Sequence, residues 1–185
     1  MSLRPATRFK SAVAPMLVLL ACTPAWGSHA AHPTPGNFSC PVAVRFSPHG
    51  GAERTVVDTL RQARAHVRAA IYGLTSPAIE AALKDLAHAG VGVALKTDKN
   101  QSAGKDQSAL LGRLRAAGVA VEVSRSRSLL HDKFAVVDGR WVITGSFNWT
   151  ASAERRNREN VLIFDCPSLA SHFQAEWESI TTARP

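Results

Sequence analysis

Strand-like and helix-like hydrophobic patterns alternate along most of this chain of 185 residues. Val42, Val44 and Phe46 alternate with their neighbours as in a strand, and the apolar residues that follow recur at helical spacing. This alternation continues to residue 123 and favours parallel strands joined by right-handed crossovers. In this part of the chain, strands are expected at 42–46, 67–74, 91–95 and 119–123, with helices between them.

The pattern changes after residue 130. Asp138-Gly139-Arg140 joins two apolar runs at 134–137 and 141–143, and Asp-Gly between such runs predicts a β-hairpin. A further strand is expected at 160–164, followed by a C-terminal amphipathic helix. We therefore expect one α/β domain with a mixed, largely parallel β-sheet flanked by helices.

Composition excludes several protein classes. Hydrophobic residues make up 45% of the chain and the mean hydropathy is −0.05, which excludes disordered and multispan membrane proteins. The 22 Lys and Arg residues outnumber the 14 Asp and Glu residues, and the formal charge of +8 favours anionic partners. Neither His-Glu-x-x-His nor Cys-x-x-Cys occurs, so we expect no catalytic metal and no cofactor.

The N-terminal residues have the pattern of an export signal. Arg4, Arg8 and Lys10 precede an uncharged apolar run at 12–21, and small residues follow this run. The run is about half as long as a membrane-spanning helix requires, so a permanent transmembrane helix is the weaker interpretation. We expect residues 1–27 to direct export to the periplasm or the exterior.

The processing site of this signal has three interpretations. Cleavage after Gly27 and cleavage after Ala30 both fit the preference for small residues. The stretch Leu19-Leu20-Ala21-Cys22 also resembles a bacterial lipobox, in which case a lipid on Cys22 would anchor the protein to a membrane. The chain thus divides into a signal peptide at 1–27, a tether at 28–39 and a folded domain at 40–185.

Two cysteines flank the folded region. Cys40 precedes the first expected strand and Cys166 follows the last one. An even pair of cysteines in an exported protein predicts a disulfide bond. The alternative is two unrelated thiols.

A set of polar residues surrounds the expected hairpin. His131 and Lys133 are two positions apart on an extended segment, so they project to the same side, and an imidazole beside an ammonium suits a phosphate-like substrate. Gly145 lets the backbone approach closely, and Ser146 and Asn148 can donate hydrogen bonds to phosphate oxygens. The set is His131, Lys133, Asp138, Gly145, Ser146 and Asn148.

This spacing, His-x-Lys-x4-Asp-x6-Gly-Ser-x-Asn, resembles the HKD signature of the phospholipase D superfamily. The chain is also similar to the small exported bacterial endonucleases of that superfamily that carry a single motif, including Phe46-Ser47-Pro48 and Glu159. The resemblance implies the phospholipase D/nuclease fold for residues 40–185. It also implies a phosphodiesterase that forms a covalent phosphohistidine and requires no metal.

The chemistry that the resemblance implies requires two histidines. One neutral imidazole attacks phosphorus, while a protonated one gives its proton to the leaving alkoxide. One chain supplies one motif, so we expect a homodimer in which each subunit contributes its His131 to a shared site. Lys133 and Asn148 would stabilise the charge of the pentacoordinate phosphorus.

The remaining residues of the pattern are expected to have supporting roles. Glu159 would accept a hydrogen bond from the second imidazole nitrogen of His131, and Ser146 would contact phosphate. Asp138 falls in the hairpin turn, where its carboxylate can bond to nearby backbone amides, so a structural role is favoured. His49 follows the first strand and is interpreted as a surface residue or as part of the rim of the site.

Basic residues lie on both sides of the motif in the sequence. A basic rim favours a polyanion over a zwitterionic lipid, because neutralised phosphates release counterions. A solvated basic surface that serves solubility is the alternative. The expected substrate-binding residues are Arg125, Arg127, Arg155, Arg156 and Arg158, with Lys96, Lys99 and Lys105 nearby.

The leading hypothesis is therefore a non-specific DNA/RNA endonuclease that acts as a homodimer and has no stable partner protein. A phospholipase D that hydrolyses phosphatidyl lipids is the alternative, although the chain from residue 28 onward lacks a long apolar lid or an amphipathic membrane helix. A third hypothesis is an inactive nucleic-acid-binding module. It predicts binding that survives the His131→Ala substitution and no cleavage product.

Overall fold

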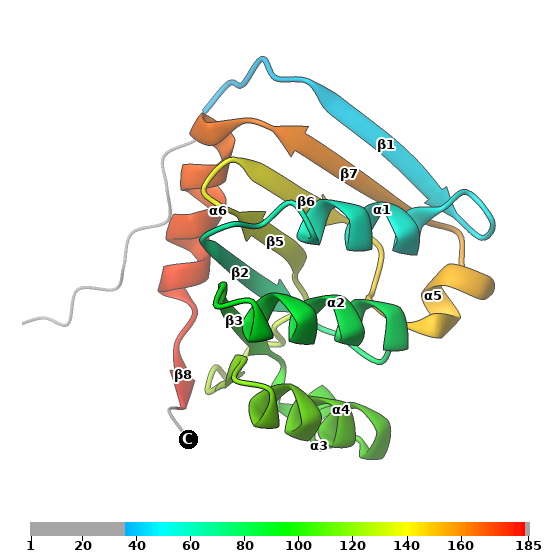
Figure 1. Cartoon of the computed structure of the whole chain (residues 1–185), viewed down its shortest axis with the longest axis vertical. Helices are drawn as coiled ribbons and strands as arrows, with labels where there is room; N and C mark the ends of the chain where they lie inside the picture. The colour runs from blue at the N-terminus through cyan, green and yellow to red at the C-terminus, as the bar shows by residue number, and fades with distance from the viewer. Residues whose placement is uncertain (1–35, 184–185) are drawn as a thin grey trace, which may run out of the picture.

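The computed structural model describes residues 36–183, so the expected signal peptide and most of the expected tether lie outside the described residues. The described part forms one eight-stranded sheet in the order β1-β7-β6-β5-β2-β3-β4-β8, with helices on both faces (Figure 1). The elements are β1 (Val42–Ser47), α1 (Ala52–Leu60), β2 (His66–Ile71), α2 (Pro77–His88), β3 (Gly92–Thr97), α3 (Lys99–Ala103), α4 (Lys105–Ala116), β4 (Ala120–Ser124), β5 (Lys133–Val137), β6 (Trp141–Gly145), α5 (Ala151–Arg155), β7 (Glu159–Asp165), α6 (Pro167–Ser179) and β8 (Thr182–Ala183).

The expected α/β class with a mixed, helix-flanked sheet is confirmed, but the parallel pairing is more limited than expected. Only β2, β3 and β4 form parallel ladders, and every other pair of neighbouring strands is antiparallel. β1 points in the same direction as β2, yet it pairs with β7 at the far edge of the sheet. The alternating pattern therefore predicted strand direction correctly and did not determine which strands are neighbours.

The alternation of side chains along the strands separates two apolar layers. Ala135, Val137 and Ile143 face the main core, which contains buried residues of α1, α2 and α4. Val136 and Val142, one position away, face α6 and form a smaller cluster with Ala170. Because successive strand residues point to opposite faces, the β5–β6 hairpin is buried on both sides. It therefore holds the residues at its two ends in fixed positions.

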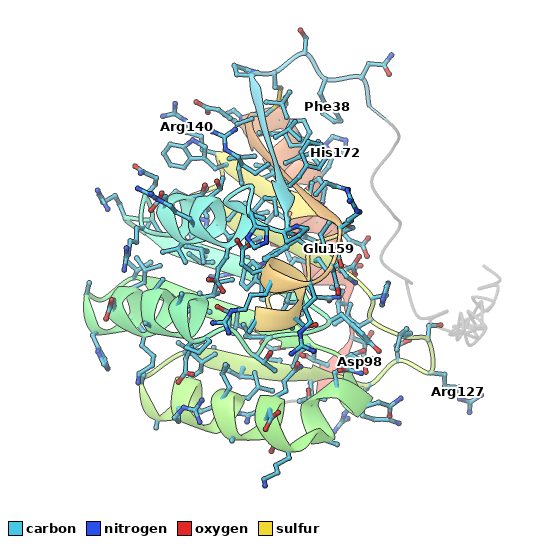
Figure 2. The ribbon with its side chains drawn as sticks, turned by 90° about the vertical axis from the view of Figure 1, so that its right-hand side faces the viewer. Phe38, Asp98, Arg127, Arg140, Glu159 and His172 are labelled. Carbon is cyan, nitrogen blue, oxygen red and sulfur yellow. A yellow bond between two sulfur atoms is a disulfide. The ribbon has the colours of Figure 1, made fainter. Side chains whose placement is uncertain are left out.

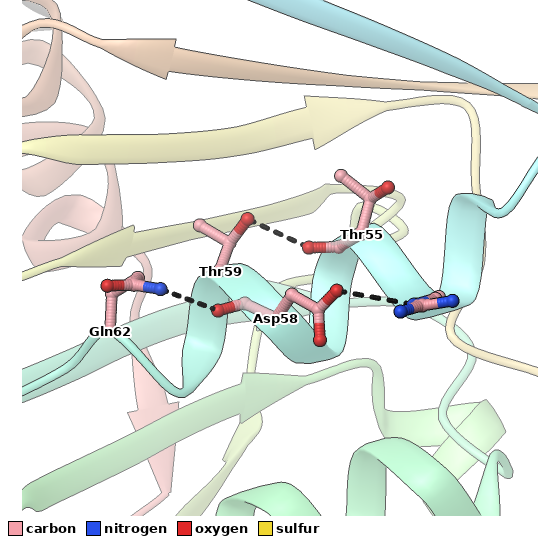
Figure 3. A network of polar contacts seen from close by, with 5 residues as sticks. Thr55, Asp58, Thr59 and Gln62 are labelled. Carbon is pink, nitrogen blue, oxygen red and sulfur yellow. Dashed lines mark hydrogen bonds and ion pairs between the residues drawn. The ribbon is translucent and has the colours of Figure 1, made fainter.

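Local signals explain several of the helix boundaries. Ser76 caps α2 by accepting a hydrogen bond from the Ile79 amide at 3.2 Å, and Pro77 occupies the first helical position. In α1, the Thr59 hydroxyl donates to the carbonyl of Thr55 at 2.8 Å, and Arg54 pairs with Asp58 one turn along (Figure 3). Contacts within α1 therefore engage an exposed ion pair, Arg54 with Asp58, and a buried hydroxyl, that of Thr59.

Three short elements were not predicted from the sequence: α3, α5 and β8. Each of the two helices has five residues and β8 has two, which is too short for a hydrophobic period to emerge. The second strand is also shorter than expected, because β2 ends at Ile71 and not at Leu74. The segment 72–74 continues beyond the sheet and contacts the motif.

The disulfide between Cys40 and Cys166 is confirmed, and it joins residues 126 positions apart in the sequence. It fastens the segment that precedes the edge strand β1 to the first residue before α6. Within residues 36–183, no helix is both long enough and apolar enough to cross a bilayer.

Replacing both Cys40 and Cys166 with serine is expected to lower the free energy of unfolding by about 4 kcal/mol, because the bond restricts the unfolded chain over a long loop. Guanidinium unfolding followed by circular dichroism measures this difference. Reduction of the wild-type protein should reproduce it, and a double variant as stable as the oxidised wild type would contradict it.

Candidate active site

The open end of the β5–β6 hairpin brings most of the predicted site residues together. β5 begins at Lys133, β6 ends at Gly145 and β7 begins at Glu159, and the antiparallel register places these three ends at the same edge of the sheet. His131 lies two residues before Lys133, and Ser146 and Asn148 follow Gly145. The structure therefore places His131, Lys133, Ser146, Asn148 and Glu159 at one edge.

His131 is exposed on the extended segment that leads into β5. The carbonyl of the next residue, Asp132, accepts a hydrogen bond from the Tyr72 amide at 2.8 Å. The imidazole ring lies 4.6 Å from the ring of Tyr72, centroid to centroid, at an interplanar angle of 60°. The Lys133 ammonium lies 5.1 Å from the centroid of the same ring, so the two motif side chains project to one side as predicted.

The ammonium group of Lys133 is held close to the histidine backbone. Its Nζ atom donates a hydrogen bond to the carbonyl oxygen of His131 at 2.6 Å. Burial lowers the pKa of Lys133, while the charges of Asp132 and Glu159 act in the opposite direction. A half-buried cation beside an exposed imidazole is suited to bind an anion that arrives from solvent.

No hydrogen bond joins Glu159 to His131 among the described residues, contrary to the expectation. Its carboxylate accepts hydrogen bonds from the Ser146 hydroxyl at 2.5 Å and from the side-chain amide of Asn157 at 3.1 Å. The Ser146 oxygen also accepts from the Asn160 amide at 3.1 Å. The proton of Ser146 is therefore directed to Glu159, so in this structure Ser146 does not present that proton as a donor to phosphate.

Asn148 packs against the segment that follows β2. Its side-chain Oδ1 atom is buried and has no hydrogen-bond partner among residues 36–183. A Cβ atom built on Gly73 would lie only 3.2 Å from this oxygen, so glycine at position 73 permits the close approach. Buried amides are normally satisfied, so the unpaired oxygen of Asn148 needs an explanation, and a place in a functional site is one.

Asp138 lies at the opposite end of the hairpin from the other motif residues. Figure 2 shows Arg140 of the same turn well away from Glu159. The Asp138 carboxylate accepts three backbone hydrogen bonds, from the amides of Arg64 at 2.7 Å, Ala65 at 2.9 Å and His66 at 2.8 Å. A structural role through nearby backbone amides was expected, and the amides belong to the connection between α1 and β2.

The pKa of Asp138 reflects these contacts. Burial raises it, but the hydrogen bonds from His66, Ala65 and Arg64 together outweigh burial and hold the pKa below its ordinary value. A carboxylate with a lowered folded-state pKa stabilises the fold above the unfolded-state pKa. It loses that contribution as the pH falls through the folded-state value.

Replacing Asp138 with asparagine is expected to lower the free energy of unfolding by about 2 kcal/mol at pH 7. The difference should begin to shrink below about pH 3.9, the ordinary pKa of an aspartate in the unfolded chain, and should be lost once the pH falls through the lower folded-state pKa. Urea unfolding over a range of pH measures it. Asp85→Asn, on the exposed side of α2, is the matched control and should change stability little; an Asp138→Asn variant that matches this control would contradict the assignment.

The predicted substrate-binding arginines are exposed on two segments beside the site. Arg125 and Arg127 lie in the loop between β4 and β5, where Arg127 projects away from the ribbon (Figure 2). The other three follow the motif, at the end of α5 and just before β7: Arg155, Arg156 and Arg158.

Lys96, in contrast, is not part of a basic rim. It is buried, and its ammonium donates hydrogen bonds to the carbonyls of Trp177 at 2.8 Å and Ile180 at 2.9 Å. Burial lowers its pKa, against the charges of Glu122 and Glu178. Lys96 was expected near the substrate, together with Lys99 and Lys105, but it lies within β3 and its ammonium is bound to the end of α6. Lys99 and Lys105 are exposed.

A cavity of about 530 Å³ lies beside the motif, between the loop before His131 and the end of α6. Asp132 and Glu176 both line it; burial raises the pKa of Asp132, and the charge of Glu176 raises it further. His131 and Lys133 do not line it, since alternate residues of an extended chain point to opposite sides. The cavity is therefore separate from the imidazole and the ammonium.

Sequence reasoning missed the residues that hold the motif from outside it. Tyr72, Gly73, Gln101 and Gln107 contact the motif or its supporting segment, and none has a motif spacing of its own. The signal available for Tyr72 was that it is the only tyrosine and lies within the strand expected at 67–74. Within residues 36–183, no group of three His, Cys, Asp or Glu side chains is arranged to hold a metal ion.

Comparison with known proteins assigns this fold and motif to a class. A family model described as "Cardiolipin synthase, PLD-like domain" matches residues 56–181. A phospholipase D from Rickettsia bellii is 33% identical over 138 residues, which cover 75% of this chain and 68% of the relative. The mitochondrial cardiolipin hydrolase of Xenopus tropicalis is 36% identical over 143 residues, which cover 77% of this chain and 65% of the relative.

A solved structure supports the same class. Nuc from Salmonella typhimurium, described as a phospholipase D family member, aligns with a TM-score of 0.74 and 30% identity, over 80% of this chain and 100% of that one. NucT from Helicobacter pylori shares the fold, with a TM-score of 0.70 at 21% identity. Fold and sequence similarity together define a phosphodiesterase of the phospholipase D superfamily. Within it, the chain belongs to the family of phospholipase D-like domains that the matching model describes.

Proposed function

We propose that this chain is a metal-independent endonuclease that cleaves DNA or RNA through a covalent phosphohistidine, in a site shared by two copies. The observation that carries the proposal is the convergence of His131, Lys133 and Asn148 at one sheet edge, with exposed arginines on both sides. Several phosphate groups of a polyanion could bind these arginines at once while one phosphate lies at the exposed imidazole.

In the first step, one nitrogen of neutral His131 attacks phosphorus, and a P–N bond forms as the P–O bond to the leaving group breaks. The leaving oxygen takes a proton from a second, protonated imidazole. In the second step, water attacks the phosphohistidine, gives a proton to that second imidazole, and the P–N bond breaks. Lys133 would stabilise the charge on the phosphorus oxygens in both steps.

The second imidazole is the reason to propose a dimer. Among residues 36–183, no hydrogen bond or ring contact joins His131 to another histidine. A two-fold axis through this edge would supply the partner subunit's His131 as the proton donor. His49 is the competing candidate, because it follows β1, whose last residue, Ser47, pairs with Glu159 at the same edge.

A phospholipase D activity on phosphatidyl lipids is the second candidate. This activity is favoured by two relatives, which are named phospholipase D and mitochondrial cardiolipin hydrolase. The chain spans about two thirds of the length of these two relatives. The distribution of exposed arginines favours nucleic acid, since a polyanion engages several cations at once.

We also propose that the protein acts outside the cytoplasm. The Cys40–Cys166 disulfide supports an oxidising compartment, which agrees with the export signal expected at residues 1–27. Detection of the cleaved chain in the periplasm or medium of a bacterium that expresses the full chain would test this location.

Purified protein in excess EDTA is expected to degrade plasmid DNA and to leave phosphatidylcholine and cardiolipin vesicles intact. His131→Ala should reduce the rate at least about a thousandfold, since it removes the nucleophile. His88→Ala, on the exposed end of α2, is the matched control. Cleavage of lipid alone would favour the second candidate, loss of activity in EDTA would contradict the phosphohistidine route, and binding without cleavage would favour the inactive module.

Mixed dimers of wild-type and His131→Ala chains are expected to be inactive. Plasmid cleavage at a constant wild-type concentration should therefore fall as His131→Ala chains are added. The two chains are refolded together at varied ratios, and plasmid cleavage is measured at constant wild-type concentration. Activity that follows the wild-type chains alone would contradict sharing. In a shared site, His49→Ala should have little effect on activity. If His49 is the proton donor instead, His49→Ala should be as inactive as His131→Ala.

A further inference from the structure

Tyr72 is the residue that contacts both motif side chains, His131 and Lys133. It follows the last residue of β2 and is the only tyrosine in the chain. Its ring centroid lies 4.6 Å from that of His131 and 5.1 Å from the ammonium nitrogen of Lys133. A ring that serves only packing would face apolar side chains, whereas this one faces an imidazole and a cation.

The position of the Tyr72 ring is fixed through its hydroxyl. The side-chain amide of Gln101, in α3, donates a hydrogen bond to the phenolic oxygen at 2.8 Å. Asp98 caps α3 by accepting from the amides of Asn100 and Gln101, and it also accepts from the amide of Leu130, just before His131. The helix that holds the phenol is therefore tied to the segment that carries the imidazole.

The backbone of Tyr72 is fixed as well. Its amide donates to the Asp132 carbonyl at 2.8 Å, and its own carbonyl accepts from the Gln107 side chain at 3.1 Å. Gln107 is buried, and it also accepts from the Leu74 amide at 2.8 Å and donates to the Thr97 hydroxyl at 3.0 Å. Both hydrogen-bonding ends of the Gln107 amide are thus engaged in holding this segment.

A nucleophilic histidine requires an orienting group that leaves the attacking nitrogen accessible. Glu159, expected in that role, is bonded to Ser146 and Asn157. A ring contact restricts rotation of the imidazole without engaging either of its nitrogens, and the same ring attracts the adjacent ammonium. The Tyr72 ring is therefore a contact that can orient the imidazole and leave its nitrogens accessible, whereas no hydrogen bond joins Glu159 to His131 within residues 36–183.

We propose that Tyr72 is a positioning residue of the catalytic centre: its ring orients the His131 imidazole and retains the Lys133 ammonium, while Gln101 fixes the ring through the phenolic hydroxyl. This inference rests on the proposed role of His131 as nucleophile. Misplacement of a reacting group by a fraction of an ångström to an ångström is enough to slow such a step strongly.

The test compares Tyr72→Leu, Tyr72→Phe and Gln101→Leu with the control Asn100→Leu, an exposed neighbour of Gln101 on α3. Hydrolysis of bis(4-nitrophenyl) phosphate in excess EDTA gives kcat and KM without assuming either biological substrate. Tyr72→Leu is expected to lower kcat about ten- to a hundredfold with little change in KM. Tyr72→Phe and Gln101→Leu should show equal, smaller losses, and Asn100→Leu none.

Proton NMR of the His131 imidazole gives a readout that altered stability alone would not move. The Tyr72 ring current displaces these resonances, which are assigned by their loss in His131→Ala. Tyr72→Phe and Gln101→Leu should both reduce the displacement, because each removes the hydrogen bond to the phenolic oxygen, and Tyr72→Leu should abolish it. If Tyr72→Leu fails to fold, the Gln101→Leu and Tyr72→Phe spectra still test the proposal, because unchanged resonances in Gln101→Leu would overturn the role of the hydroxyl bond.

Full activity and unchanged His131 resonances in Tyr72→Leu would overturn the proposal. Loss of activity with unchanged resonances would overturn it too, since Tyr72 would then act in some way other than by orienting the imidazole. Failure of the proposed function is distinguishable, because the wild-type protein would then hydrolyse no phosphodiester while the NMR comparison still reports on the contact between Tyr72 and His131.

Discussion

Backbone hydrogen bonds from the segment after β2 hold the two halves of the motif together. The Tyr72 amide donates to the carbonyl of Asp132, and the Gly73 carbonyl accepts from the Trp149 amide at 2.8 Å. The amides of Thr75 and Ser76 donate to the Trp149 carbonyl as well. Without these bonds, the segments before β5 and after β6, which carry His131 and Asn148, would lack these attachments to the rest of the fold. With them, the segments that carry His131 and Asn148 are fixed to a strand buried in the centre of the sheet, which gives an active site the precision that it requires.

The spacing of the motif follows from the geometry of the hairpin. The residues between Lys133 and Asp138 form β5, and those between Asp138 and Gly145 complete the turn and β6. One signature therefore combines two tasks at opposite ends of one hairpin. His131 and Lys133 face solvent at the open end, while the Asp138 carboxylate binds the connection between α1 and β2 at the closed end. The lowered pKa of Asp138 thus reflects hydrogen bonds that stabilise the fold, at a distance from the residues proposed for catalysis.

Much of the fold and the centre of the site could be predicted from the sequence, because the signals are local. The Asp138-Gly139 turn has positive φ at both residues, 51° and 63°, which is the conformation that Asp-Gly predicts between two strands. Ser76 and Pro77 begin α2 as their residue types favour, and the Cys40–Cys166 pairing followed from the positions of the two cysteines. The common side of His131 and Lys133 followed from the period of an extended chain. The position of Lys96 and the hydrogen-bond partner of Glu159 were predicted wrongly. The partners of Lys96 lie at the end of α6 and just after it, and Ser146, which binds Glu159, follows β6; no local pattern specifies either.

By itself, the sequence determined the order of strands and helices, the hairpin, and which side chains accompany His131, because turn propensity and hydrophobic period act over a few residues. Only the tertiary structure decided that β1 pairs with β7 at the far edge, that Asp138 binds amides more than 70 positions away, and that the Tyr72 ring, bonded to Gln101, contacts the imidazole. Those contacts join segments distant in the chain. They are selected by the packing of the whole sheet and its helices, which no window of sequence contains.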